Sequence, residues 1–129
     1  MSGAKKGMKV LDYCAGKGTK TLALYERMKE KGNIFIYDIN EDRLKVLKKR
    51  LKYLKINNKV NIFKNNKNFH NYFDLILLDV PCSGSGVWRR RPDEIIKLDL
   101  TNYKKNLKIQ ASILEEAAKF ISKNGLISY

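Results

Sequence analysis

The chain has 129 residues, of which 43% are hydrophobic and 31% are charged, and its net charge at pH 7 is +14. This length and hydrophobic content predict one globular domain spanning 1–129 and exclude a disordered chain. No apolar run reaches the roughly 20 residues of a membrane-spanning helix, and the N-terminus lacks the apolar stretch of a secretory signal. We therefore expect a soluble, cytoplasmic protein. Its two cysteines are too few for a disulfide scaffold or a structural zinc site, so no metal is expected.

The positive charge favours a polyanionic partner, above all nucleic acid. Most of the excess is lysine, and asparagine is also abundant. An AT-rich genome produces that pairing without any selection for binding, so the charge is a modest argument on its own.

Strands and helices are predicted to alternate along the chain. Short apolar runs predict strands at Lys9–Tyr13, Ile34–Tyr37, Val60–Phe63, Leu75–Asp79 and Leu126–Tyr129. Helical spacing of apolar residues predicts helices at about Thr19–Lys31, Glu41–Leu54 and Asn106–Lys123. This order predicts an α/β fold with a doubly wound, mostly parallel sheet.

Glycines are expected to end two of these helices. Gly32, with Asn33, would cap the first helix, and Asn124-Gly125 would cap the last. The last helix is expected to bury one apolar face, made of Ile109, Ile113, Leu114, Ala117 and Ile121.

The segment after the predicted fourth strand carries candidate chemistry. It reads Asp79-Val80-Pro81-Cys82-Ser83-Gly84-Ser85-Gly86 and places a carboxylate three residues before a thiol. Open α/β sheets bind their ligands at the carboxyl ends of the strands. The alternative is an ordinary strand-to-loop junction with an inert cysteine.

A glycine turn and an acidic residue indicate a nucleoside-containing cofactor. Gly16-Lys17-Gly18 lies between the first strand and the first helix, and Asp38 follows the second strand, where a carboxylate can accept both ribose hydroxyls. A dinucleotide fingerprint requires a third glycine or alanine where this chain has Thr21, and Asp12 would repel phosphate. These features favour S-adenosylmethionine, which is cationic, over a dinucleotide.

Three segments together resemble the RNA 5-methylcytosine methyltransferases of the RsmB/Sun type. They are Leu11-Asp12-Tyr13-Cys14-Ala15-Gly16-Lys17-Gly18-Thr19-Lys20-Thr21, Asp38-Ile39-Asn40-Glu41-Asp42-Arg43-Leu44 and the segment that begins at Asp79. The resemblance covers nearly the whole chain and implies a Rossmann-like methyltransferase fold. It also implies S-adenosylmethionine as cofactor and transfer of a methyl group to cytosine in RNA, expected to be single-stranded or loop ribosomal RNA.

The resemblance also implies roles for individual residues. Asp79, paired with Lys20, would lie between the cofactor and the target cytosine, and Cys82 would assist product release. Asn65 stands where the family usually has an aspartate that contacts adenine. The full set expected around the cofactor is Cys14, Ala15, Gly16, Lys17, Gly18, Thr19, Lys20, Asp38, Arg43, Asn65 and Asp79.

Two further expectations concern the protein's extent and its partner. In this family the attacking cysteine lies in a Thr-Cys-Ser motif immediately after the position of Tyr129, so we expect the chain to be an inactive fragment without the N-terminal RNA-binding region. Arg89, Arg90 and Arg91 are expected to contact RNA phosphates or to form a solvated loop.

Alternative functions remain open at this point. Pro81-Cys82 also fits the DNA cytosine-5 methyltransferases, in which a cysteine in the comparable loop attacks the base directly. A truncated, non-catalytic remnant that still binds cofactor or RNA is a second possibility. Cys14 is expected to pack against the cofactor and to take no part in the reaction.

Overall fold

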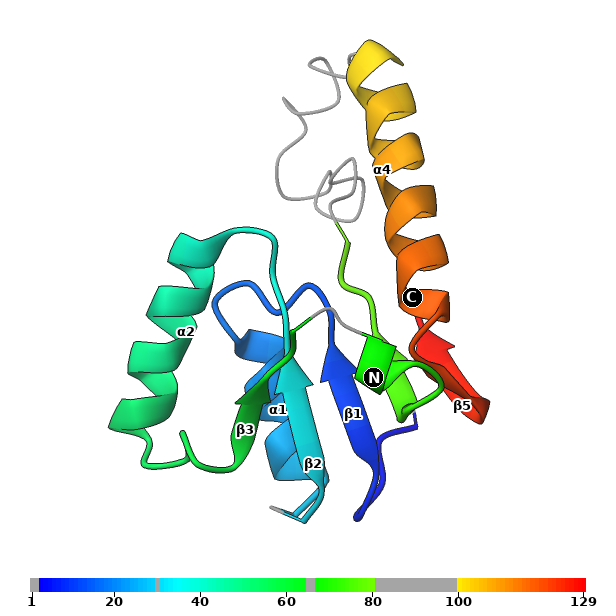
Figure 1. Cartoon of the computed structure of the whole chain (residues 1–129). Helices are drawn as coiled ribbons and strands as arrows, with labels where there is room; N and C mark the ends of the chain where they lie inside the picture. The colour runs from blue at the N-terminus through cyan, green and yellow to red at the C-terminus, as the bar shows by residue number, and fades with distance from the viewer. Residues whose placement is uncertain (1–2, 30, 65–66, 81–99) are drawn as a thin grey trace.

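The computed structural model describes residues 3–29, 31–64, 67–80 and 100–129, and within them the chain forms a five-stranded parallel sheet with the strand order β3-β2-β1-β4-β5 (Figure 1). The strands are β1 (Lys9–Asp12), β2 (Asn33–Ile36), β3 (Val60–Ile62), β4 (Phe73–Leu77) and β5 (Ile121–Ser128). The helices are α1 (Thr19–Arg27), α2 (Glu41–Tyr53), a short 3-10 helix η1 (Lys67–Phe69) and α4 (Leu100–Ala118). The predicted α/β class and parallel sheet are confirmed.

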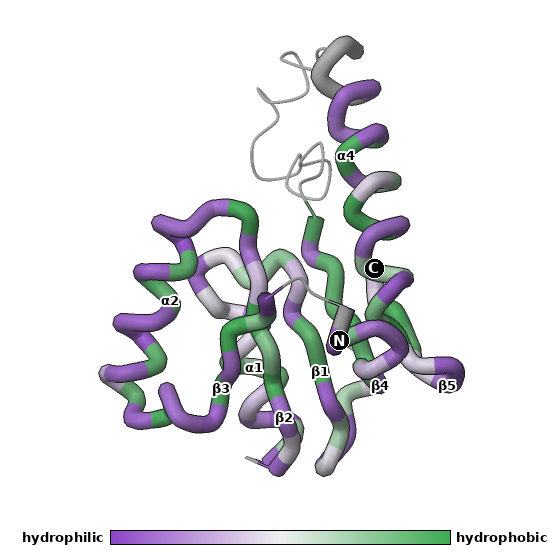
Figure 2. Tube along the Cα trace, viewed as in Figure 1, coloured by the Kyte–Doolittle hydropathy of each residue, from purple (hydrophilic) through white to green (hydrophobic). Residues whose placement is uncertain are grey.

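Two apolar layers hold the helices against the sheet. On one face, Leu24 of α1 and Leu47 of α2 pack against strand residues such as Ile34. On the other face, Ala117 of α4 belongs to a cluster with Phe73 of β4 and a group of rings from several elements. Figure 2 shows hydrophobic residues along the central strands and a mostly hydrophilic α2, whose leucines at 44, 47 and 51 are its buried residues.

The end of α1 differs from the prediction. The helix ends at Arg27, and the left-handed conformation that follows it belongs to Lys29, with a φ of 50°. Gly32 therefore does not cap the helix. It lies just before β2, where an added Cβ would be 2.9 Å from the carbonyl oxygen of Met8 and 2.1 Å from the Cε of Met28. The glycine is needed there for close packing of the chain.

The predicted end of α4 is also wrong. The helix ends at Ala118, and the strand that follows begins at Ile121, which is paired with Phe73 of β4. Gly125 lies inside this strand, at a shift in register, and an added Cβ there would be 2.8 Å from the carbonyl oxygen of Phe73. Pairing with β4 thus overrides the helical spacing of the apolar residues at this point.

Burial along α4 follows the prediction only near its end. Ala117 is fully buried and Ile113 is partly buried, but Ile109 is 38% exposed and Leu114 is 40% exposed. The helix begins six residues earlier than predicted, and Figure 1 shows its first turns extending past the edge of the sheet. The apolar spacing continues beyond the surface that α4 can pack against.

The topology places a ligand site at the carboxyl ends of β1 and β4. The chain runs outward from β1 through β2 to β3 and then returns to the other side of β1 as β4. Open α/β sheets bind ligands at such a reversal, because the two adjoining loops leave the sheet in opposite directions.

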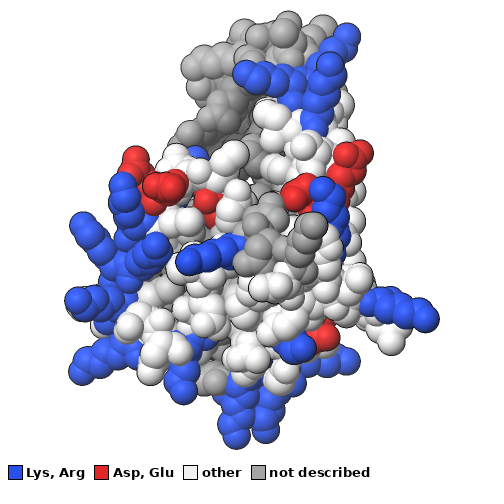
Figure 3. Space-filling model, viewed as in Figure 1, with Lys and Arg blue, Asp and Glu red and all other residues white. Residues whose placement is uncertain are grey.

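None of the described helices is long and apolar enough to cross a bilayer. Figure 3 shows Lys and Arg side chains gathered over α2 and, separately, over the edge of the sheet where the strands begin.

Candidate cofactor-binding site

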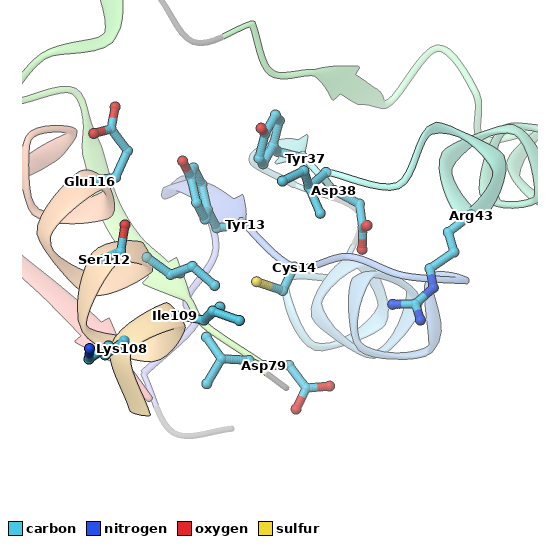
Figure 4. Close-up of a pocket in the computed structure, with 13 residues that line it drawn as sticks. Tyr13, Cys14, Tyr37, Asp38, Arg43, Asp79, Lys108, Ile109, Ser112 and Glu116 are labelled. Carbon is cyan, nitrogen blue, oxygen red and sulfur yellow. The ribbon is translucent and has the colours of Figure 1, made fainter. Parts of the chain in front are cut away.

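A pocket of about 780 Å³ opens at the carboxyl ends of β1, β2 and β4 and is closed on one side by α4 (Figure 4). Three chain segments that leave the strands form one wall, and the exposed part of α4 forms the other. The lining residues are Tyr13, Cys14, Tyr37, Asp38, Ile39, Arg43, Asp79, Val80, Lys108, Ile109, Ser112, Ile113 and Glu116. This is the position that the topology predicts for a ligand.

The turn between β1 and α1 requires its glycines. Gly16 and Gly18 have φ values of 55° and 89°, a region that side chains with a Cβ rarely adopt. An added Cβ on Gly18 would also be 2.1 Å from the Cδ1 of Leu47, which is fully buried. The turn therefore places the backbone and the start of α1 close to the pocket.

Asp38 joins this turn to the end of β2. One carboxylate oxygen accepts a hydrogen bond from the backbone N–H of Gly16 at 2.8 Å, and the other accepts one from the N–H of Asn40 at 2.8 Å. The residue is only 7% exposed and lines the pocket. Two backbone donors thus fix a carboxylate at the pocket wall before any ligand arrives.

Asp12 lies beneath the same turn and does not line the pocket. It is completely buried, and one carboxylate oxygen accepts a 2.7 Å hydrogen bond from the hydroxyl of Thr21. Its other oxygen has no hydrogen-bond partner among the residues that the structure describes. Burial raises the pKa of Asp12 to about 6, an effect that the hydrogen bond from Thr21 partly opposes. Thr21, which departs from the dinucleotide fingerprint, has a structural role here.

Lys20 and Asp79 form an ion pair that links the start of α1 to the chain after β4. The resemblance implied this pairing, and the structure contains it, although the catalytic role assigned to the two residues stays a prediction. Both side chains are well exposed to solvent, so the pair itself contributes little to stability.

Cys14 lies among the acidic groups of the pocket, between Tyr13 and Asp38 in Figure 4. Burial, and then the negative charges of Asp38, Asp12 and Asp79, raise the pKa of its thiol to about 11. A thiol with this pKa is protonated at neutral pH and is a poor nucleophile. That Cys14 packs against the cofactor and takes no part in the reaction stays a prediction.

The charges of this wall fit a cationic ligand better than a phosphate. Asp38 and Asp79 line the pocket, and Asp12 lies close enough for its charge to act on Cys14. Lys20 is paired with Asp79. A ligand that carries a sulfonium or an ammonium group would gain from these carboxylates, while Arg43 is a cation that also lines the pocket.

The structure brings together some of the predicted site residues. Four of them line the pocket: Cys14, Asp38, Arg43 and Asp79. Lys20 does not line it but forms an ion pair with Asp79. Ala15, Gly16 and Gly18 form the turn, whereas Lys17 and Thr19 are exposed and do not line the pocket. The predictions for Asn65, Cys82, Arg89, Arg90 and Arg91 fall outside the described residues.

Sequence reasoning missed the rest of the lining. Ile39 is 89% exposed at the pocket, although it directly follows the predicted Asp38. Lys108, Ser112 and Glu116 lie four residues apart and share one face of α4. That spacing was available in the sequence, but nothing in it indicates that this face of α4 turns toward the pocket. Among the described residues, no cluster of three or more His, Cys, Asp or Glu side chains could hold a metal.

Known proteins resemble this chain along almost its whole length. The model of the 16S rRNA methyltransferase RsmB/F family matches residues 3–129. The chain is 35% identical over 125 residues to the "Probable ribosomal RNA small subunit methyltransferase B" of Bacillus subtilis (strain 168), covering 93% of this chain and 28% of that protein. It is 30% identical over 125 residues to the ribosomal RNA small subunit methyltransferase F of Escherichia coli O1:K1 / APEC, covering 94% of this chain and 26% of that protein.

A solved structure supports the same relationship. A methyltransferase homolog protein from Pyrococcus horikoshii superposes with a TM-score of 0.72 at 29% identity, covering 95% of this chain and 39% of that one. The chain thus spans less than a third of the length of the two curated relatives. Because the family model matches almost every residue, the chain belongs to the 16S rRNA methyltransferase RsmB/F family, whose members depend on S-adenosylmethionine.

Proposed function

We propose that this chain forms the cofactor-binding part of an S-adenosylmethionine-dependent RNA methyltransferase that makes 5-methylcytosine in ribosomal RNA. The observation that carries the proposal is the buried Asp38 carboxylate, held at the pocket by the N–H groups of Gly16 and Asn40. The relatives named above are ribosomal RNA methyltransferases, which supports this substrate class.

Residues in and beneath the pocket offer partners for the ribose, the adenine ring and the sulfonium of S-adenosylmethionine. Each oxygen of Asp38 accepts one backbone hydrogen bond and has a second acceptor site for a ribose hydroxyl. The exposed Ile39 offers an apolar surface beside it for the adenine ring. The carboxylates of Asp12 and Asp79 favour the positive end of the molecule. The cofactor supplies a methyl group bound to a positively charged sulfur.

The chemistry at cytosine requires a nucleophile and a base. Carbon 5 of the ring is a weak nucleophile until a thiolate adds to carbon 6, after which carbon 5 can take the methyl group. A base then removes the carbon 5 proton, and the thiolate leaves carbon 6. We assign to Asp79 the contact with the polar edge of the ring, and its ion pair with Lys20 supports this role by restraining the carboxylate.

Cys14 is not suited to the first step, because its raised pKa keeps the thiol protonated. We assign the attack to a cysteine in a Thr-Cys-Ser segment of the full-length enzyme and the release step to Cys82. In a full-length protein, Cys82→Ala should then accumulate a covalent protein–RNA complex. If Cys82 attacks instead, as in the DNA enzymes, the same variant should form neither the complex nor methylated RNA.

Calorimetric titration of the 129-residue chain with S-adenosylmethionine tests the cofactor site directly. Asp38→Ala should weaken binding by about 1–3 kcal/mol, or roughly 5- to 150-fold, because a charged acceptor is lost. Asp42→Ala is the matched control, since Asp42 is exposed, pairs with Lys45 and does not line the pocket. Equal dissociation constants for the wild type and Asp38→Ala would refute this placement of the ribose.

A further inference from the structure

The positive charge of this protein is concentrated in one segment. Residues 43–73 contain ten Lys or Arg residues and no Asp or Glu, so they carry ten of the fourteen net charges. The rest of the chain is close to balanced, with seventeen basic and thirteen acidic residues. A general bias in composition would spread the excess along the whole chain. The segment therefore needs an explanation of its own.

Helix α2 carries six of these basic residues and arranges them in two neighbouring rows. One row starts at Lys45 and continues with Lys48, Lys49 and Lys52, which lie three, four and seven residues after it on the same face of the helix. Arg43 and Arg50 are separated by seven residues and form the second row. All six side chains are exposed, while the opposite face is buried against the sheet. Figure 3 shows this basic surface over α2.

Few of these cations have acidic partners. Lys45 pairs with Asp42 at 2.9 Å in the first turn. Within the described part of the chain, no ion pair is formed by Lys48, Lys49 or Lys52. Uncompensated cations on one face of a helix attract a polyanion, because binding releases the counterions that the polyanion holds.

Apolar side chains lie beside the arginine row. Val46 and Tyr53 are three residues beyond Arg43 and Arg50, respectively, and are 48% and 86% exposed. An aromatic ring that protrudes among cations is the combination used to bind single-stranded nucleic acid, in which bases are free to stack.

The basic surface is continuous with the candidate site. Arg43 lines the pocket, and Arg50 donates a weak hydrogen bond of 3.5 Å to the carbonyl oxygen of Lys17 in the glycine turn. The helix then runs about 20 Å away from the pocket, at 1.5 Å per residue over 13 residues. A strand of RNA that enters the pocket can follow this path.

We infer that the outer face of α2 is a docking surface for single-stranded RNA, with the Lys and Arg rows contacting phosphates and Tyr53 stacking on a base. This inference rests on the proposed function for the identity of the nucleic acid. It names a surface that holds the RNA flanking the target nucleotide, several nucleotides away from the reacting base.

Fluorescence anisotropy of a labelled, unstructured RNA 12-mer, measured on the 129-residue chain over a range of NaCl concentrations, tests the inference. The triple variant Lys48→Gln, Lys49→Gln, Lys52→Gln should reduce the slope of log affinity against log salt by about 2, since each phosphate contact contributes about 0.7. The control is Lys5→Gln, Lys6→Gln, Lys31→Gln, which removes the same charge from exposed positions at the beginnings of β1 and β2. The control should leave the slope unchanged.

Tyr53 provides a second, independent readout. Tyr53→Ala should weaken RNA binding roughly 5- to 150-fold without changing the salt slope, and Tyr53→Phe should bind as the wild type does. Equal losses in the two triple variants, or no RNA binding by the wild type, would overturn the inference. Binding of S-adenosylmethionine, measured on the same samples, should be unaffected in every variant. Lost cofactor binding in the wild type with intact α2-dependent RNA binding would refute the proposed function alone.

Discussion

The two walls of the pocket are built in different ways. On the strand side, two backbone N–H groups donate hydrogen bonds that fix Asp38. In the core beneath it, the Thr21 hydroxyl donates a hydrogen bond to Asp12. On the helix side, Lys108, Ile109 and Ser112 are all exposed. The first wall is therefore preorganised for a small ligand of fixed shape, whereas side chains of the second wall remain free to adjust. Substitutions in the two walls should differ sharply in their cost.

Within the preorganised wall, the largest effect on stability is expected at Gly18. Gly18→Ala places a Cβ in a left-handed conformation and against the buried Leu47, and should lower the free energy of unfolding by about 2–5 kcal/mol. Gly7→Ala is the matched control, because Gly7 has a φ of 87° but no atom of the described residues lies within 4 Å of the added Cβ. Urea denaturation of both variants separates backbone strain from overpacking. Equal losses in the two would show that Leu47 yields freely and that the turn is not rigid.

The next effect concerns pH and Asp12. Because burial raises the pKa of Asp12 from 3.8 to about 6, the folded state binds a proton more tightly than the unfolded state does. The free energy of unfolding should therefore fall as the pH rises from about 4 to about 6, by up to about 3 kcal/mol for this group. Asp12→Asn should remove this component.

Urea denaturation at several pH values from 4 to 8 measures the difference between the wild type and Asp12→Asn. Asp42→Asn serves as the control, since Asp42 is exposed and its replacement should leave the pH profile close to that of the wild type. Identical profiles for the wild type and Asp12→Asn would mean that the buried carboxylate does not govern this range.

The smallest effects are expected on the α4 wall. Ile109→Ala and Ser112→Ala replace exposed side chains and should change the free energy of unfolding by no more than about 0.5 kcal/mol. By contrast, Leu24 on the buried face of α1 is 1% exposed, and Leu24→Ala should lower the free energy of unfolding by about 2–5 kcal/mol. Thermal denaturation compares the three variants, and a large loss at Ile109 would show that α4 packs more tightly than its exposure indicates.

The same contrast explains what the sequence could predict. Some features depend only on neighbouring residues in the sequence. They include the glycine turn at Gly16 and Gly18, where φ is positive, and the position of Asp38 just after a strand. The order of strands and helices follows from hydrophobic spacing, which predicted α2 to within one residue.

The features that depend on distant contacts could not be predicted in this way. Pairing with Phe73 draws Ile121 into a strand that its helical spacing does not indicate. The buried hydrogen bond from Thr21 to Asp12 joins residues nine positions apart, and it forms only when α1 packs against β1. Likewise, the side of α4 that faces the pocket is set by how the helix lies on the sheet, so Lys108 and Ser112 carry no local signal of their role.

A nuclear magnetic resonance titration of the ¹⁵N-labelled 129-residue chain with S-adenosylmethionine tests the central claim most directly. The amide signals of Gly16, Gly18 and Asn40 should shift together and saturate, because Asp38 and the glycine turn form one preorganised wall. The amide signals of Lys5 and Lys6 should not shift, because these residues precede β1 and lie at the end of the sheet away from the pocket. Saturable binding that leaves Gly16, Gly18 and Asn40 unmoved, or the absence of any binding, would contradict the account.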